Sequence, residues 1–149
     1  MEDLTTIILT FNEELHIRRS IENVKSISKE IFVLDSFSKD NTCQIAENLG
    51  AKVFKNAWPG NQALQFNWAL ENLPIKTKWV LRLDADEYLY SELVQEIKSK
   101  LNDLPEGING VVFKRRHIFL NKWMNRGTYP VKMLRLFRYQ TAVCEQRLM

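Results

Sequence analysis

The chain has 149 residues, 45% of them hydrophobic and 26% charged, with a formal net charge of +3. This composition suits one globular domain with a single core. The acidic start, whose longest apolar run is Ile7 to Leu9, excludes a signal peptide and a membrane span there, so we expect a cytoplasmic location. Cys43 and Cys144 lack a CxxC spacing, which argues against a disulfide framework and a zinc site.

Charge is distributed unevenly along the chain. Residues 1–106 carry 12 Lys and Arg against 17 Asp and Glu, whereas residues 107–149 carry 9 against 1. From Gly107 to Cys144 there is no acidic residue, and aromatic residues lie between the basic ones. This segment could face phosphate groups or an anionic membrane surface, or it could be a solvated face that pairs with the acidic part.

The chain begins with a strand pattern followed by a helix pattern. Leu4 to Thr10 is predicted to be a strand. Asn12 is expected to cap the next helix, in which Ile17, Ile21 and Val24 recur at helical spacing.

A second strand and helix follow in the same order. The stretch "EIFVLDS" is predicted to be a buried strand that ends at Asp35, and Ser38 or Asp40 can cap a helix that stops at Gly50. Ala51 to Asn56 is predicted to be a third, shorter strand.

Two more elements complete the pattern. A helix is expected near Ala63 to Leu73, and Lys78 to Asp84 supplies a fourth strand. Leu93, Ile97 and Leu101 then form one stripe of a last helix. Strands and helices in this alternation predict an α/β fold with a mostly parallel, Rossmann-like sheet flanked by helices.

Polar and aromatic residues gather where these predicted strands end, the place at which open α/β sheets bind ligands. They are Thr10, Phe11, Asn12, Asp35, Asp84 and Asp86. Because side chains alternate along a strand, Asp84 and Asp86 would project to one side, and a divalent cation would relieve their repulsion. With only five Gly and no glycine-rich phosphate loop, the phosphates of a ligand would need that metal. The predicted site therefore suits a base, a ribose and a metal-bound diphosphate.

The strings "ILTFNEE", "FVLDSFSKDNT", "QFNWAL" and "WVLRLDADE" occur in this order. Together they resemble the nucleotide-binding half of the family 2 glycosyltransferases, which have the GT-A fold, and most closely the bacterial branch that builds lipopolysaccharide and other surface polysaccharides. The resemblance implies inverting transfer of a sugar from a nucleotide-sugar, in particular a UDP-sugar, to a glycan or lipid-linked acceptor. No nucleic acid is expected as a partner.

The resemblance also implies roles for individual residues. The nucleotide-binding residues would be Thr10, Phe11, Asn12, Glu13, Asp35 and Asp84, and the ligands of Mg²⁺ or Mn²⁺ would be Asp86 and Asp84. Phe11 would stack on the base. Residues 1–106 would form the nucleotide-sugar-binding region, and 107–149 a basic acceptor-side segment of the same domain, incomplete because family chains usually extend further.

Two positions depart from the family pattern. Many members carry Arg-Asn in the third helix, where this chain has Phe66 before Asn67, so Gln65 or Lys55 is a candidate substitute. The catalytic base normally comes from a later acidic motif. Glu145 is the sole acidic residue after residue 106, which makes it the candidate base.

Other interpretations remain open at this point. Phe11 could pack against the following helix, Asp35 could be a turn former, and Asp84 and Asp86 could cap the helix after Ser91. An aspartyl-phosphate phosphatase also has a DxD motif after a strand, although normally the first one. A truncated or inactive chain that binds nucleotide without transferring sugar is the other alternative.

Overall fold

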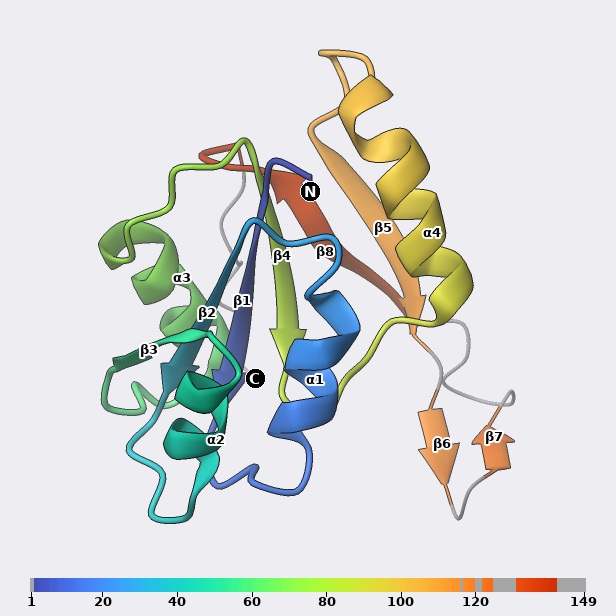
Figure 1. Ribbon diagram of the computed structural model, residues 1–149. Coiled ribbons are helices and arrows are strands. Elements are labelled where there is room, and N and C mark those ends of the chain that lie inside the picture. The colour runs from blue at the N-terminus through green and yellow to red at the C-terminus, as the bar shows by residue number, and fades with distance from the viewer. Residues whose placement is uncertain (1, 116, 120–121, 125–130, 142–149) are drawn as a thin grey trace.

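The computed structural model describes residues 2–115, 117–119, 122–124 and 131–141, and the side chains from 115 to 132 lie outside that description (Figure 1). The main sheet has six strands in the order β3-β2-β1-β4-β8-β5. Its strands are β1 (Leu4–Thr10), β2 (Glu30–Asp35), β3 (Lys52–Lys55), β4 (Trp79–Asp84), β5 (Gly110–Arg115) and β8 (Val131–Arg138). The helices are α1 (Ile17–Val24), α2 (Thr42–Asn48), α3 (Gln62–Asn72), α4 (Ser91–Lys100) and the short 3-10 helix η1 (Leu101–Asp103). A separate pair, β6 (His117–Phe119) and β7 (Lys122–Met124), is antiparallel.

The first four strands form the parallel part of the sheet. β1 pairs in parallel with β2 and β4, and β2 pairs in parallel with β3. All seven residues of β1 are buried, as expected for a central strand covered on both faces. The predicted Rossmann-like α/β fold is confirmed.

The last part of the sheet is antiparallel. β8 runs antiparallel to β4, and β5 runs antiparallel to β8. The sequence pattern did not identify these two strands, which join the basic segment to the same sheet as β1 to β4. Among the described residues, no helix has the length and apolar character needed to cross a membrane.

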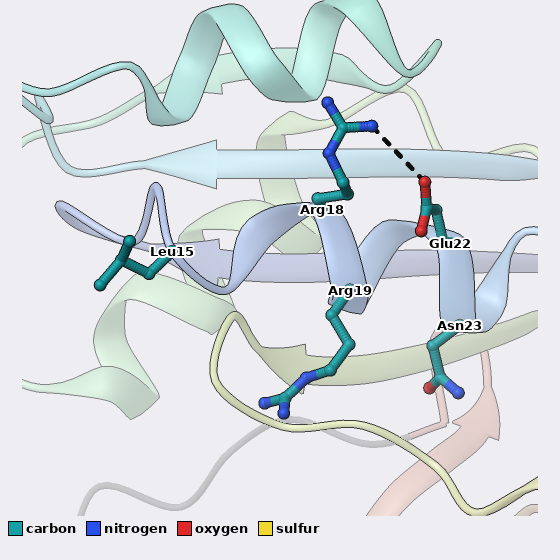
Figure 2. Close-up of a pocket in the computed structure, with 5 residues that line it drawn as sticks. All are labelled: Leu15, Arg18, Arg19, Glu22 and Asn23. Atoms are coloured by element: carbon teal, nitrogen blue, oxygen red, sulfur yellow. Dashed lines mark ion pairs between the residues drawn. The ribbon is translucent and has the colours of Figure 1, made fainter.

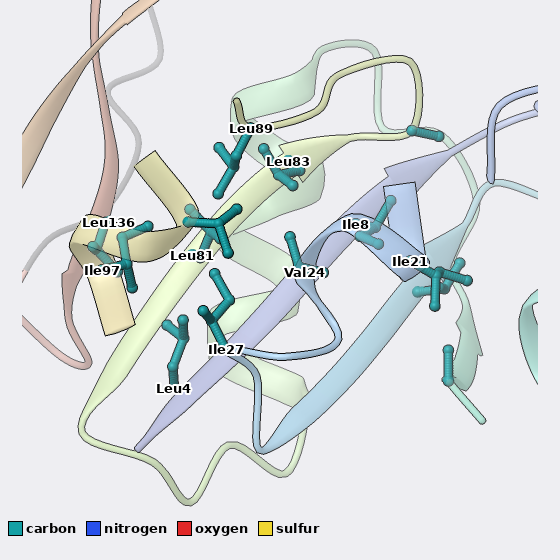
Figure 3. Close-up of a cluster of buried hydrophobic side chains, with 14 of the residues drawn as sticks. Leu4, Ile8, Ile21, Val24, Ile27, Leu81, Leu83, Leu89, Ile97 and Leu136 are labelled. Carbon is teal, nitrogen blue, oxygen red and sulfur yellow. The ribbon is translucent and has the colours of Figure 1, made fainter. Parts of the chain in front are cut away.

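Two apolar clusters cover opposite faces of the sheet. α1, α2 and α4 pack on one face, where Ile21, Leu81 and Ile97 are buried together (Figures 1 and 3). α3 packs on the other face, where Phe66 and Val80 are buried. Val80 and Leu81 are neighbours on β4, and because side chains alternate along a strand, Leu81 lies in the first cluster and Val80 in the second. Arg82 and Asp84 share the parity of Val80 and therefore lie on the α3 side.

The predicted caps need correction. Asn12 does not cap α1, which begins at Ile17 after His16. Asn12 has a left-handed backbone with φ of 51°, and its Oδ1 accepts a hydrogen bond from the Lys39 backbone N–H at 2.8 Å. The side chain thus serves the neighbouring loop instead of a helix end. The residue preceding α2 is Asn41, although Asp40 accepts a hydrogen bond from the Thr42 backbone N–H at 3.0 Å.

Candidate functional site

The carboxyl ends of β1, β2 and β4 meet at one edge of the sheet. In the strand register, Thr10 lies beside Asp35 and Leu9 lies beside Asp84. The predicted convergence of strand ends is therefore present, and it follows from parallel pairing of adjacent strands.

A cleft of about 600 Å³ opens at this edge. The predicted residues that line it are Thr10, Phe11, Glu13, Asp84 and Asp86. Its volume is in the range of small-molecule sites, and its lining combines an aromatic ring with carboxylates. Five of the predicted residues thus border one space.

Asn12 and Asp35 support the cleft without lining it. The Asn12 backbone N–H donates to Ser38 Oγ at 2.8 Å. The carboxylate of Asp35 is fully buried and accepts hydrogen bonds from the backbone N–H of Ser38, at 2.7 Å, and from its hydroxyl. These contacts are those of a turn former, and they connect the loops that follow β1 and β2.

The two aspartates differ in exposure. Asp86 is exposed, whereas the side chain of Asp84 is 20% exposed and lies 3.7 Å from Nη2 of Arg82. β4 ends at Asp84, and the Glu87 backbone N–H donates to the Asp84 carbonyl at 2.9 Å, so a tight turn brings both aspartates to the cleft. This turn, Asp84 to Glu87, is called the acidic turn below. α4 begins only at Ser91, after Tyr90, so neither aspartate caps it.

The acidic turn fits a cation that is shared with a phosphorylated ligand. In the described part of the chain, no three His, Cys, Asp or Glu side chains gather to hold a metal by themselves. Within the residues that the structure describes, Asp84 Oδ1 is buried and accepts no hydrogen bond, since Nη2 of Arg82 approaches it only to 3.7 Å. Such a state is costly for a carboxylate oxygen. Mg²⁺ is commonly bound by one or two carboxylates together with substrate phosphates. Asp84 and Asp86 supply that number of hard oxygen ligands.

Two aromatic rings border the cleft and are about half exposed. Phe11 is 53% exposed and Trp58 is 51% exposed. The exposure of Phe11 disfavours packing against the following helix as its main role. Trp58 was not predicted, although a tryptophan beside Pro-Gly in a loop between two elements could have indicated it.

α3 forms one wall of the cleft, and it carries Phe66 at the position where many family members have an arginine. Phe66 is buried in the core, and Gln65 lines the cleft while its Nε2 donates to the Asn56 carbonyl at 3.0 Å. Arg82 of β4 brings a guanidinium group to this wall, where it donates to Gln62 Oε1 at 3.2 Å and lies 5.3 Å from the centre of the Phe66 ring. Gln62 also lines the cleft. On the α3 side, a positive charge near the cleft therefore comes from β4, and the sequence pattern alone did not indicate it.

A second groove, of about 490 Å³, runs along α1 (Figure 2). Arg18 points toward Glu22, with which it pairs at 3.5 Å, whereas Arg19 points toward the loop after β4. Nη2 of Arg19 donates to the Asp86 carbonyl at 3.1 Å, and its guanidinium lies 4.3 Å from the centre of the Tyr88 ring. This groove therefore borders the acidic turn on the α1 side. Glu145, the candidate base, lies outside the described residues.

Comparison with solved structures identifies the fold. A glucosyl-3-phosphoglycerate synthase from Mycobacterium tuberculosis in complex with UDP is 22% identical, with a TM-score of 0.60 over 75% of this chain and 44% of that chain. S. aureus TarS is 20% identical, with a TM-score of 0.59 over 93% of this chain and 47% of that chain. These likenesses support the GT-A fold.

Comparison with curated proteins identifies the family. Uncharacterized glycosyltransferases from Rickettsia typhi and Rickettsia felis are 44% and 45% identical over 98 residues, which is 66% of this chain and 32% and 34% of those proteins. A TPR repeat-containing protein from Synechococcus elongatus is 30% identical over 148 residues, covering 99% of this chain and 34% of that protein. The chain thus spans about a third of the length of these relatives. The family description "Glycosyl transferase family 2" matches residues 5–147, a finding that favours the predicted glycosyltransferase over the phosphatase, and the chain belongs to this family.

Proposed function

We propose that this chain forms the nucleotide-sugar-binding part of an inverting glycosyltransferase that uses Mg²⁺ or Mn²⁺ and a UDP-sugar. The observation that carries the proposal is the cleft of about 600 Å³ in which Phe11, Asp84 and Asp86 lie together, although Phe11 follows β1 and the two aspartates lie at and just after the end of β4. A structural neighbour crystallised with Mn²⁺, UDP and glucosyl-3-phosphoglycerate, at a TM-score of 0.57 and 21% identity, supports the choice of donor and metal.

The nucleotide- and metal-binding residues predicted from the sequence have chemical tasks in this proposal. Phe11 stacks on the base, with Thr10 and Glu13 beside it. Asp86 and Asp84 hold the cation against the diphosphate. When bound, such a cation stabilises the negative charge that develops on the leaving diphosphate. Asp35 does not line the cleft, but its buried carboxylate binds Ser38 and so fixes the loop after β2 beside the cleft.

The acceptor side is proposed to lie in residues 107–149. An acceptor hydroxyl attacks the sugar from the face opposite the diphosphate, which requires a base, and Glu145 is the proposed base. The eight Lys and Arg between Lys114 and Arg138 suit a phosphorylated or lipid-linked glycan of surface polysaccharide synthesis. Peripheral contact with the inner face of the membrane would follow. Co-sedimentation with anionic but not neutral vesicles, lost when Arg115, Arg116 and Lys122 are reversed in charge, tests this contact.

Calorimetric titration with UDP, with and without Mn²⁺, tests the central proposal. Wild-type protein should bind UDP in a Mn²⁺-dependent manner, and Asp86→Ala should lose that dependence because the diphosphate loses its cation. Asp103→Ala is the matched control, since Asp103 is an exposed carboxylate on η1, away from the cleft lining. Retention of wild-type Mn²⁺ dependence by Asp86→Ala would refute the ligand assignment.

Two further measurements test the stacking role of Phe11 and the transferase activity separately. Phe11→Ala should weaken UDP binding by about 1 to 3 kcal/mol without unfolding the protein, because the lost contact is base stacking. An unchanged affinity would remove the stacking role. Hydrolysis or transfer of a UDP-sugar, measured as UDP release, separates an active transferase from a chain that binds nucleotide without transferring sugar.

A further inference from the structure

Glu87, the last residue of the acidic turn, joins that turn to a distant strand. Its Oε1 accepts a hydrogen bond from the Asp84 backbone N–H at 2.8 Å. The same carboxylate meets Arg135 of β8 through two contacts, 3.2 Å from Oε1 to Nη1 and 3.3 Å from Oε2 to Nη2. One side chain therefore links the start of the turn to a guanidinium that is 48 residues further along the chain.

Burial makes this link more rigid than a surface ion pair. The side chain of Arg135 is 6% exposed and that of Glu87 is 21% exposed. The contact from Nη2 to Oε2 is a hydrogen bond, and the one from Nη1 to Oε1 is an ion-pair contact. A charge-assisted hydrogen bond between largely buried groups restricts their orientation as well as their distance. Glu87 can therefore rotate little, and its Oε1 is kept opposite the Asp84 amide.

The acidic turn is consequently fixed at both of its ends. The Glu87 backbone N–H donates to the Asp84 carbonyl at 2.9 Å, while the Glu87 side chain accepts from the Asp84 N–H. Both backbone polar groups of Asp84 are thus bound to Glu87. The side chain of Asp84 and, two residues later, that of Asp86 leave this fixed backbone toward the cleft.

We propose that Glu87, oriented by Arg135, is the positioning residue that holds Asp84 and Asp86 ready for a metal-bound diphosphate. This inference rests on the proposed function. It gives the basic segment, residues 107–149, a role in the donor site as well as the acceptor side. Through Glu87, Arg135 of β8 fixes the positions of the Asp84 and Asp86 carboxylates. Groups that orient metal ligands typically change metal affinity by about 10- to 100-fold when they are removed.

Two double variants separate the effect of the hydrogen bond between the Asp84 N–H and residue 87 from the effect of the Glu87 and Arg135 charges. Glu87→Gln/Arg135→Met and Glu87→Leu/Arg135→Met both remove the buried charges together, so neither leaves a charge without its counterpart. They differ in whether residue 87 offers an oxygen to the Asp84 N–H. We expect the Mn²⁺ affinity of the UDP complex to fall about tenfold or more in the Leu variant. It should fall less in the Gln variant, which keeps the acceptor for the Asp84 N–H but loses the guanidinium that orients it. The affinity for uridine without metal should be the same in both.

Hydrogen exchange of the Asp84 amide gives a readout that needs neither metal nor nucleotide. This amide should be most protected in the wild type, less protected in the Gln variant, and should exchange fastest in the Leu variant. Glu30→Gln/Lys52→Met, which removes an exposed ion pair of 3.2 Å between β2 and β3, is the matched control and should change neither readout.

Several results would overturn the inference. Equal Mn²⁺ affinity in the two double variants would overturn it, whatever that affinity is. The two variants differ only in whether residue 87 has an oxygen that can accept a hydrogen bond from the Asp84 N–H. Rapid exchange of the Asp84 amide in the wild type would do so even if a variant failed to fold. Wild-type protein that binds no UDP with Mn²⁺ would instead refute the proposed function, while the exchange experiment would still decide whether Glu87 fixes the turn.

Discussion

The loop after β2 and the acidic turn after β4 lie at the same edge of the sheet, yet they are held in different ways. Asp35 is bound by Ser38, three residues later, and Asp40 by Thr42, two residues later. The acidic turn is held by Arg135, 48 residues from Glu87, and by Arg19, 67 residues from Asp86. The first loop is therefore held by contacts within itself and by the neighbouring loop after β1, through Asn12. The acidic turn depends instead on β8 and α1.

This difference indicates which substitutions far from the site should change its geometry. A change in β8 or α1 alters the acidic turn directly, whereas the loop after β2 should respond mainly to changes within itself and in the loop after β1. The contrast can be tested by removing one carboxylate from each region and comparing the free energies of unfolding.

The largest effect is expected for Glu87→Leu. This single substitution leaves the guanidinium of Arg135 buried without its carboxylate, a change that typically costs about 3 to 5 kcal/mol. Urea denaturation measures the loss in the free energy of unfolding. Glu30→Gln, which breaks an exposed pair with Lys52, should cost only about 0 to 1 kcal/mol, and equal losses in the two variants would contradict the contrast.

An intermediate effect is expected for Asp35→Ala. The backbone N–H and the hydroxyl of Ser38 both lose their acceptor, and a buried polar group without a partner costs about 1 to 3 kcal/mol. Burial, followed by a hydrogen bond to Asp35 and its negative charge, raises the pKa of Cys43 to about 11. Faster alkylation of Cys43 in Asp35→Asn, located by peptide mass spectrometry, would report the same loop, and unchanged stability and reactivity would speak against its dependence on Asp35.

The smallest effect concerns Asp40 and acid. Burial raises the pKa of Asp40, but hydrogen bonds from the Thr42 hydroxyl, the Thr42 N–H and the Glu14 N–H lower it by more, so the pKa is below its ordinary value. The ionised form therefore stabilises the fold above the unfolded-state pKa of roughly 4, and this contribution is lost as the pH falls through the folded-state pKa. Asp40→Asn should flatten this part of the acid unfolding curve, and a curve of unchanged slope would contradict the prediction.

Sequence reasoning identified the parallel part of the fold because its signals are local. The buried apolar runs of β1, β2 and β4 end in polar residues, which is sufficient to predict strands and a ligand edge. Phe11 and Asp86 were predicted in the cleft and do line it. β5 and β8 were not recognised, since their apolar residues lie in a segment whose many Lys and Arg resemble a charged surface.

The missed site residues share a physical cause. The roles of Arg82 and Arg135 depend on partners elsewhere in the chain, Gln62 and Glu87. The same cause explains the error at Asn12, whose side chain bonds to Lys39 instead of the nearest helix. Local propensity favoured a cap there, and a contact between loops prevailed.

The position of β8 has a consequence for how the chain acquires its structure. β8 is the last of the six sheet strands in sequence, yet it lies between β4 and β5. During synthesis, β4 and β5 therefore each keep an unpaired edge until residues 131–138 have emerged from the ribosome. Unpaired strand edges are templates for association with other chains, and pairing across a long sequence separation is slow. A nascent chain halted before Val131 should consequently bind chaperones and aggregate, whereas one extended past Arg138 can close its sheet.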